Sequence, residues 1–444
     1  MNRSKMSTIL AIAIAALVVI AAVAIGWFIF KGDPALLRDA AVADDQISPN
    51  ADGDQDATKI SYEITRNSNV SIYFEDENGE RFYFRNDQQR GAGEYSVLFS
   101  GVVDGYTVPD DEIEGEILAR LLRDGQYTWT IQAIDGQNRL GTSSGSIAIV
   151  EADSVLPELR DFGLDKRDFT PNRDGIADRV QIQFFLPKEV VQTRVFLLTP
   201  DGSELPVAEL ERGVAAGEPG WHIFDYEGGV DNNATPPEDG IYPVIAIVED
   251  AEGQRIKVVD ELTIRFGGVP RAEIISPAIG DTVQFDATAV ALCETIGFTF
   301  TVQNYGTTPI RTSGPPPGTV YDSDWNYNTL GWHTESGAWR VAIGYENEIA
   351  NYPYRWALGS EDDLEKIGDY YYLMPGERAV VTGGIRVVDV FGDRNPQPVW
   401  AGLIHEDVEI SLFNNRVDPH SILVDLPDPE HIEECEPREI PEFD

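Results

Sequence analysis

Short alternations of apolar and polar residues recur along most of the chain. Runs such as Val70–Phe74 and Tyr127–Ile131 alternate in this way between turns rich in Gly, Asp and Asn. A period of two residues is typical of strands with one buried face, so the pattern predicts an all-β fold. The exception is Asp110–Arg123, whose apolar residues follow helical spacing and predict a short inserted helix.

The N-terminal stretch from Ser7 to Phe30 carries no charged residue and consists mainly of Ala, Ile, Val and Leu. About 20 apolar residues suffice for a helix that crosses a bilayer. A signal peptide has a shorter apolar region that ends at small residues, whereas this one ends in Trp27–Phe30. We therefore expect a retained single-pass anchor in contact with membrane lipid. The short N-terminal tail would lie in the cytoplasm and the bulk of the chain outside the cell membrane.

An internal repeat follows the anchor. Ile47–Asp56 returns as Phe169–Asp178, with Pro-Asn-x-Asp-Gly-x-x-Asp in both copies, and each copy precedes an alternating strand. The far ends also match, because Asp-Gly-x-Tyr occurs at Asp124–Tyr127 and at Asp239–Tyr242. The spacing predicts two homologous modules of about 100 residues, the usual size of a seven-strand sandwich. We place them at 41–152, with the inserted helix, and at 153–268.

These openings and endings resemble bacterial surface Ig-like repeats, such as the Ig-like module of the flagellar hook-capping protein and the C-terminal repeats of gliding-motility proteins. The resemblance covers Ile47 to about Ile149 and Phe169 to about Ile264. It implies an Ig-like fold and a surface location, and little about chemistry. The sequence departs from the family at Ala51 and Arg173, where a Gly usually follows the Asn.

The pattern changes from about Pro270. The run Gly297–Ile310 contains Val-Gln-Asn-Tyr-Gly and resembles a strand and turn of bacterial adhesion-type Ig-like domains. We predict a larger Ig-like β-sandwich over 269–426 and a disordered tail, rich in Pro and Glu, over 427–444. Residues 1–40 would hold the cytoplasmic stub, the anchor and a linker. The expected architecture is thus an N-terminal transmembrane helix followed by three tandem Ig-like β-sandwich domains.

The chain is strongly acidic, with 76 Asp and Glu against 33 Lys and Arg and a net charge of -43. Such a surface repels nucleic acid and attracts divalent cations or basic partners. The hydrophobic fraction of 42% indicates a buried core rather than disorder. Cys293 and Cys435 are the two cysteines, and one disulfide between them would tie the tail to the third module.

The two Pro-Asn loops are candidate calcium sites. In the first loop, oxygen-bearing side chains alternate, at Asn50, Asp52, Asp54 and Asp56. Calcium takes about six to eight such oxygens. The second loop keeps fewer of them, at Asn172, Asp174 and Asp178. The alternative interpretation is that these side chains accept backbone N–H groups within the turn, while Gly supplies a positive φ.

A second candidate site is aromatic. Four tryptophans fall in one Gly- and Asn-rich stretch, at Trp325, Trp332, Trp339 and Trp356. Exposed in one plane, they would stack on sugar rings. The alternative is that they pack in the core of a β-sandwich, as large aromatic side chains commonly do.

No catalytic motif stands out. The five histidines are scattered, and the sequence has no His-Glu-x-x-His pair or phosphate-binding loop. We therefore expect a non-enzymatic cell-envelope protein whose repeats present a C-terminal binding module to an envelope protein or surface polymer. One alternative is a glycan-binding accessory protein or carbohydrate-active enzyme. The other is a subunit of an extracellular assembly that accepts a partner strand at a sheet edge.

Overall fold

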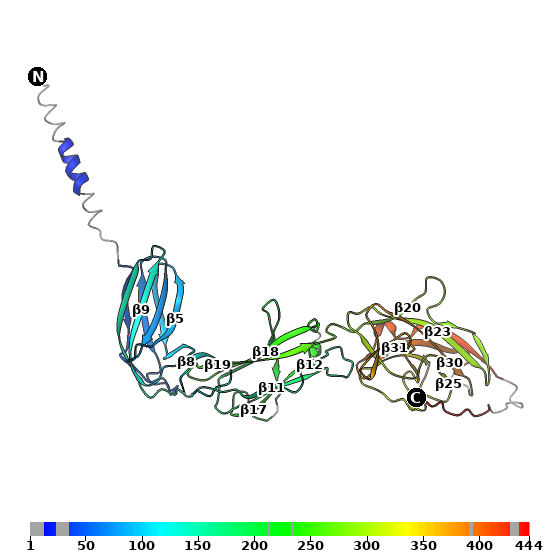
Figure 1. Cartoon of the computed structure of the whole chain (residues 1–444). Helices are drawn as coiled ribbons and strands as arrows, with labels where there is room; N and C mark the ends of the chain where they lie inside the picture. Colours follow the sequence, from blue (N-terminus) through cyan, green and yellow to red (C-terminus); the bar gives the residue numbers. More distant parts are fainter. Residues whose placement is uncertain are drawn as a thin grey trace, which may run out of the picture.

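The computed structural model describes residues 13–23, 35–109, 111–211, 213–232, 234–389, 394–426 and 435–443. Residues 13–23 are helical and exposed, and the rest of the expected anchor over 7–30 lies outside the described residues. Among the residues that the structure describes, no helix is long and apolar enough to cross a membrane. Beyond the helix the fold is all-β, as predicted, and three β-rich bodies follow one another in an extended row (Figure 1).

Two sheets enclose the first hydrophobic core. One has the order β1 (Leu37–Val42), β3 (Thr58–Ile64), β6 (Gly93–Phe99). The other has the order β2 (Gln46–Ile47), β10 (Leu140–Ile149), β9 (Gly125–Asp135), β4 (Ser68–Glu75), β5 (Arg81–Arg90). Alternate residues of β3 and β4 point into the core, where Phe74 stacks on Phe99 at 4.1 Å between ring centroids. The period of two residues therefore does mark the buried face.

The second core also lies between two sheets. The smaller sheet has the order β11 (Arg160–Leu164), β13 (Val180–Leu186), β17 (Gly220–Tyr226), β16 (Ala208–Glu209). The larger has the order β15 (Glu204–Pro206), β14 (Gln192–Leu198), β18 (Gly240–Glu249), β19 (Arg255–Ile264), β8 (Glu116–Leu121), β7 (Val102–Asp104). The short β12 (Asp168–Phe169) pairs with β19, and η1 spans Val230–Asn232. Strands β7 and β8 belong in sequence to the first repeat, so the larger sheet spans both repeats.

The helix expected over Asp110–Arg123 is wrong. Within the described part of that segment, β8 pairs antiparallel with both β7 and β19. The apolar residues of this segment follow helical spacing because they pack against two different cores. Ile113 and Ile117 pack against the second core, whereas Leu122 is buried in the first.

The third body is the largest. Its five-stranded sheet has the order β20 (Ala272–Ile275), β23 (Thr295–Asn304), β30 (Arg378–Arg386), β25 (Val320–Asp322), with β21 (Gln284–Phe285) beside β23. Its nine-stranded sheet has the path β22 (Ala289–Ala291), β33 (Val417–Asp425), β31 (Gln397–His405), β26 (Trp339–Tyr345), β24 (Ile310–Thr312), β29 (Tyr370–Leu373), β28 (Glu365–Ile367). Beside this path, β27 (Tyr354–Ala357) pairs with β26, and β32 (Glu409–Ile410) pairs with β31. The turn η2 spans Leu412–Asn414. Three large clusters of buried apolar residues thus follow the order of the three expected modules, whose boundaries stay predictions.

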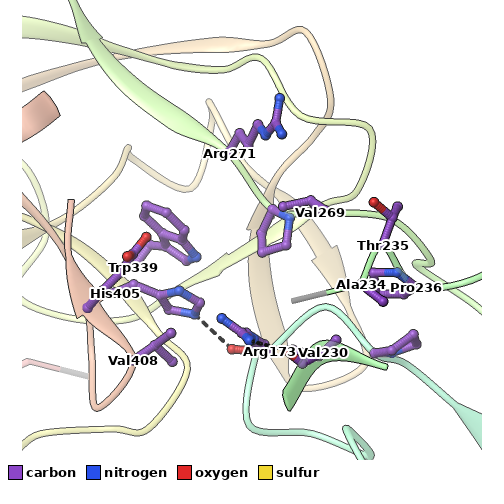
Figure 2. A pocket seen from close by; sticks show the side chains of 14 residues that line it. Arg173, Val230, Ala234, Thr235, Pro236, Val269, Arg271, Trp339, His405 and Val408 are labelled. Carbon is purple, nitrogen blue, oxygen red and sulfur yellow. Dashed lines mark hydrogen bonds between the residues drawn. The ribbon is translucent and has the colours of Figure 1, made fainter. Parts of the chain in front are cut away.

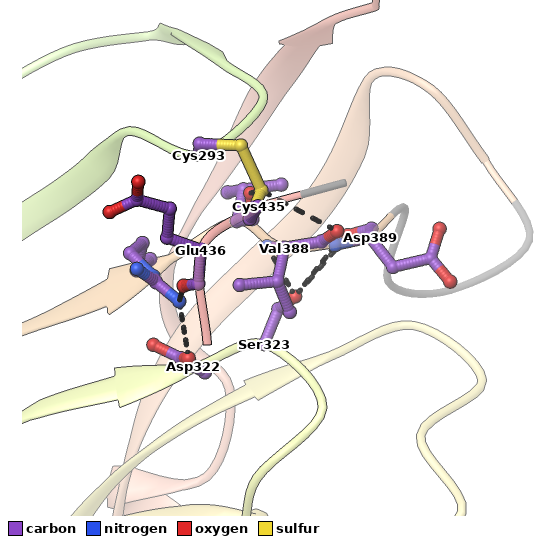
Figure 3. Close-up of a disulfide and its surroundings, with 9 residues drawn as sticks. Cys293, Asp322, Ser323, Val388, Asp389, Cys435 and Glu436 are labelled. Atoms are coloured by element: carbon purple, nitrogen blue, oxygen red, sulfur yellow. Dashed lines mark hydrogen bonds and ion pairs between the residues drawn. A yellow bond between two sulfur atoms is a disulfide. The ribbon is translucent and has the colours of Figure 1, made fainter. Parts of the chain in front are cut away.

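Cys293 and Cys435 are joined by a disulfide, with 5.4 Å between their Cα atoms (Figure 3). Beyond it, residues 435–443 lie against the third body although composition predicts disorder there. Arg438 reaches Asp322 Oδ1 at 3.3 Å, and the ring of Phe443 lies 6.0 Å from that of Trp332. A covalent link and these contacts order a segment that has few apolar residues of its own. Residues 427–434 and 444 of the expected tail lie outside the described residues.

Candidate functional site

The joint between the first and second repeats is a continuous sheet with a buried polar contact beside it. Gln254 is fully buried; its Oε1 accepts the N–H of Leu121 at 3.3 Å. Its Nε2 donates to the carbonyl oxygens of Asp153 and Val155 at 3.1 and 3.0 Å. Gly115 sits at φ +101°, where a Cβ would lie 2.5 Å from the carbonyl oxygen of Lys257. The joint therefore depends on close backbone approach, which glycine permits.

Lys188 adds an ionic contact to this first joint. Its Nζ lies 3.0 Å from Asp153 Oδ2, in the connection between the repeats, and 3.1 Å from Asp250 Oδ2 in the second repeat. Burial opposes the charge on Lys188, but the carboxylates around it outweigh burial and raise its pKa. The connection is thereby held to the second repeat over its length rather than only at its ends.

The second joint is built on the second Pro-Asn loop. Asn172 and Asp174 are 1% and 2% exposed, because the loop inserts into the third body. The Asp174 carboxylate accepts from Ile176 N at 2.8 Å, Asn172 Nδ2 at 3.0 Å and the Tyr372 hydroxyl at 3.1 Å. Burial raises the pKa of Asp174, and its three donors act against this rise. Its oxygens are thus engaged by donors from both sides of the joint.

The backbone of this loop is held as firmly as its side chains. Arg311 is 3% exposed, and its Nε donates to the Asp174 carbonyl oxygen at 2.7 Å. His405 Nε2 donates to the Arg173 carbonyl oxygen at 2.8 Å. A Cβ on Gly337 would lie 2.1 Å from the Asp174 carbonyl carbon. Contact this close leaves no room for the third body to slide along the loop.

A groove of about 260 Å³ opens beside the second joint. Figure 2 shows Trp339, His405 and Val408 on one wall and Ala234–Pro236 opposite, with Arg173 between them. The His405 ring stacks on Trp339 at 4.4 Å between centroids, and burial lowers the pKa of His405 to about 4. The imidazole is therefore neutral at neutral pH, with its Nε2–H committed to Arg173. It serves the joint and is not placed as an acid or base.

The first Pro-Asn loop is solvated. Asp52, Gly53 and Asp54 are exposed, and oxygens of Asn50, Asp52 and Asp56 turn inward onto the backbone of the turn. Asn50 Oδ1 accepts from Asp52 N at 3.1 Å, Asp52 Oδ1 from Asp54 N at 2.8 Å, and Asp56 Oδ2 from Gly53 N at 2.7 Å. The geometry fits the turn-capping interpretation. In the second loop, Gly175 N likewise donates to Asp178 Oδ2, at 2.6 Å. The calcium sites in both loops stay predictions.

The four tryptophans do not form one exposed plane. Trp339 and Trp356 are 4% and 0% exposed, and Trp356 Nε1 donates to the Thr319 carbonyl oxygen at 3.0 Å. Trp325 and Trp332 are partly buried against the same core, near Arg438 and Phe443. The expectation of a stacking surface across all four is wrong, because the sheets of the third body need large side chains to fill a wide core.

Sequence reasoning missed a buried ionic network next to these aromatics. Arg340, Arg355 and Glu406 are 0%, 9% and 3% exposed. Arg355 Nη1 lies 2.7 and 2.8 Å from the two Glu406 oxygens, and its guanidinium carbon lies 4.1 Å from the Tyr327 ring centroid. Burial lowers the pKa of Arg340, and Glu406 counteracts this. Arg340 lies on β26, Arg355 on β27 and Glu406 in the turn after β31, so no sequence spacing connects them.

No family model and no curated protein matches this chain. Solved structures do. The chain is 12% identical to a tetra-tandem repeat from the extending region of a large adhesion protein, covering 82% of this chain and 81% of that one, with a TM-score of 0.19. A Ca2+-stabilized adhesin with which an Antarctic bacterium binds ice is 12% identical, with coverage of 88% and 74% and a TM-score of 0.23. The Bacteroides ovatus protein SGBP-B, solved with a mixed-linkage heptasaccharide, is 10% identical, with coverage of 89% and 71% and a TM-score of 0.15.

Repeats of bacterial adhesins are therefore among the structural neighbours of this chain. The specific likeness to hook-capping and gliding-motility repeats stays a prediction.

Proposed function

We propose that this chain is a non-enzymatic, membrane-anchored cell-envelope protein that acts as a rigid strut. Its two Ig-like repeats hold the third module at a fixed distance and angle from the membrane, and the third module contacts an envelope protein or surface polymer. The N-terminal segment supplies the anchor. A strut needs folded units joined by stiff joints, and catalysis is not required of it.

The stiffness of the two joints carries this proposal. Domains in one chain move relative to each other by default unless the interface between them is specific and well packed. Here the first joint is a shared sheet, in which β8 of the first repeat pairs with β19 of the second. The second joint is a buried loop held by Arg311, His405 and Tyr372. Both joints resist bending because bending would break buried hydrogen bonds.

The acidity of the chain agrees with the same role. A net charge of -43 spread over an extended surface keeps copies soluble and apart. A strut that repels its neighbours stays unassociated until its distal module meets its partner.

Photo-crosslinking in intact cells tests where the partner binds. A crosslinking residue replaces Ile349 or Phe413, which are 103% and 91% exposed on the third body, or Leu98, which is 70% exposed on the first. We expect one envelope component to be captured from the third-body positions and not from Leu98. Equal capture from Leu98, or capture of cytoplasmic proteins alone, would refute the proposal.

Small-angle scattering of the full chain tests the stiffness separately. The wild-type curve should fit one extended conformer. A Gly115→Val variant should need an ensemble of bent conformers, because its side chain would meet the carbonyl oxygen of Lys257. An ensemble already required for the wild type would rule out a rigid strut.

A further inference from the structure

A cluster of metal-ligating side chains lies on the third body, away from both joints. Asp418 and His420 stand two residues apart on β33, and Asp281 lies on the loop between β20 and β21. One ligand atom from each of the three lies within 4.8 Å of the other two. Strand and loop are more than 130 residues apart in sequence, as the hydrogen bond from Val283 N to Asp418 Oδ2 illustrates.

A β-bulge aims Asp418 at the loop. The ladder between β31 and β33 shifts register between Val399, which pairs with His420, and Ala401, which pairs with Val417. Asp418 lies in the extra segment at φ +49°, a conformation that an L-residue seldom adopts. Bulges of this kind re-aim side chains, often beside functional sites. Here the carboxylate accepts the N–H of Val283 at 2.9 Å, which fixes its orientation toward Asp281 and His420.

His420 has a ring nitrogen, Nε2, that forms no hydrogen bond with good geometry. Its Nε2 is buried and makes no hydrogen bond, although Asp418 Oδ2 lies 3.3 Å away. The Phe285 ring packs against the imidazole at 5.3 Å between centroids, so the ring is held in this direction. A buried polar nitrogen without a hydrogen bond is costly, and a bound cation would remove that cost.

The donor set identifies the class of cation. One imidazole nitrogen with two carboxylates suits borderline cations such as Zn2+, which bind such atoms at about 2.0–2.2 Å. Calcium and magnesium prefer oxygen ligands alone. We propose that Asp281, Asp418 and His420 bind a zinc-class divalent cation, with the fourth coordination position open to water. Asp281 is exposed, so its side chain is free to turn the short distance that tetrahedral coordination requires.

The bound cation would link the β20–β21 loop to β33. Two hydrogen bonds order this loop in the absence of metal. One runs from Val283 N to Asp418, and the other joins Ser276 Oγ and Thr282 Oγ1 at 2.8 Å. Ile279 in the same loop is 91% exposed. The neighbouring turn η2 is tied to β20, because Ile274 N donates to Asn414 Oδ1 at 2.9 Å. A metal link would therefore stiffen one exposed corner of the third body.

Zinc binding to the full chain tests the site. The metal-free protein is titrated with Zn2+ by calorimetry, with millimolar Mg2+ present to occupy weak acidic sites. We expect one Zn2+ per chain with an affinity that falls at least tenfold in Asp281→Asn and in His420→Gln. The matched controls Asp362→Asn and His333→Gln, at exposed positions on the same body, should stay within twofold of wild type.

A second measurement separates binding from folding. Zn2+ should raise the melting temperature of the third body by a few degrees in the wild type and both controls, and not in Asp281→Asn. Because Asp281 is exposed, this variant should fold normally without metal. Wild-type affinity in Asp281→Asn, or Zn2+ uptake only at many weak sites that neither substitution alters, would overturn the proposal.

Discussion

The two Pro-Asn loops share a motif and much of their local hydrogen bonding, yet they have opposite surroundings. Gly53 N donates to Asp56, and Gly175 N donates to Asp178 in the same way. The first loop lies in solvent, whereas Asn172 and Asp174 of the second are buried against the third body. A turn motif therefore specifies its own conformation, and what it does for the protein depends on the structure packed against it.

The reason for the difference lies in the β7–β8 hairpin. In the first repeat this insertion extends the sheet of the second repeat and makes the joint. The first loop is then left beside the connection, where Pro49 O accepts from Asp153 N at 3.1 Å and the following residues stay exposed. The second repeat lacks such a hairpin among its described strands, so its loop makes the next joint itself.

The largest expected effect comes from comparing Gly337, which faces the second loop, with Gly53, which lies within the first. In Gly337→Ala the new Cβ would lie 2.1 Å from Asp174, at φ +79°, and we expect a loss of about 4 kcal/mol in unfolding free energy. In Gly53→Ala, at φ +90° with nothing within 4 Å, we expect about 1–2 kcal/mol from backbone strain alone. Calorimetric unfolding of both variants measures the difference. Equal losses of unfolding free energy in the two variants would contradict the close contact between Gly337 and Asp174.

The pH dependence of the unfolding free energy should reveal the contribution of His405 at the second joint. The folded-state pKa of His405 is about 4, below its ordinary value of 6.5, so the folded state disfavours protonation. The stabilisation that His405 contributes is therefore complete above pH 6.5 and is lost as the pH falls toward 4, by about 3 kcal/mol.

In His405→Gln this acid-side loss should vanish. Burial, reinforced by Asp174, raises the pKa of Asp178 to about 6, so Asp178 contributes the opposite slope as the pH falls. Because Asp178 is present in the wild type and in His405→Gln, the difference between their curves of stability against pH isolates the contribution of His405. If the two stability curves ran parallel from pH 7 to 4, protonation of His405 would not be coupled to the stability of the joint.

Matched substitutions of the loop carboxylates should differ by a smaller amount. Asp174→Ala leaves the buried Tyr372 hydroxyl and Asn172 amide without this acceptor, and we expect a cost of about 2–3 kcal/mol. Asp52→Ala removes one exposed turn contact and should cost about 0.5 kcal/mol. Chemical denaturation of the two variants provides the comparison. A larger cost at Asp52 than at Asp174 would contradict the importance of the buried contacts of the second loop.

Calcium should have the smallest effect. Oxygens of Asn50, Asp52 and Asp56 already accept backbone N–H groups, so addition of 1 mM Ca2+ to metal-free protein should shift the melting temperature by less than about 1 °C. The control is Asp54→Asn under the same conditions. A shift of several degrees that Asp54→Asn abolishes would establish the first loop as a calcium site.

The sequence alone determined the repeat, its Pro-Asn turns and alternating strands such as the one over Val70–Phe74 in the first two modules. Alternation at Val70–Phe74 marked a strand with a buried face because strand side chains have a period of two residues. The Pro-Asn-x-Asp-Gly motif marked turns because Asn, Asp and Gly act locally, through hydrogen bonds between near neighbours. Such features need no knowledge of distant residues.

Tertiary structure alone decided the roles of these elements. Asp110–Arg123 has helical spacing, but Glu116–Leu121 within it forms β8, because residues of this segment pack against two cores that its own sequence does not reveal. Trp339 and Trp356 are buried because two sheets close over them. Glu406, in the turn after β31, meets Arg340 of β26 and Arg355 of β27, and Asp281 of a distant loop meets Asp418 and His420 of β33. Register and sheet order bring such residues together, and both depend on the whole fold rather than on local pattern.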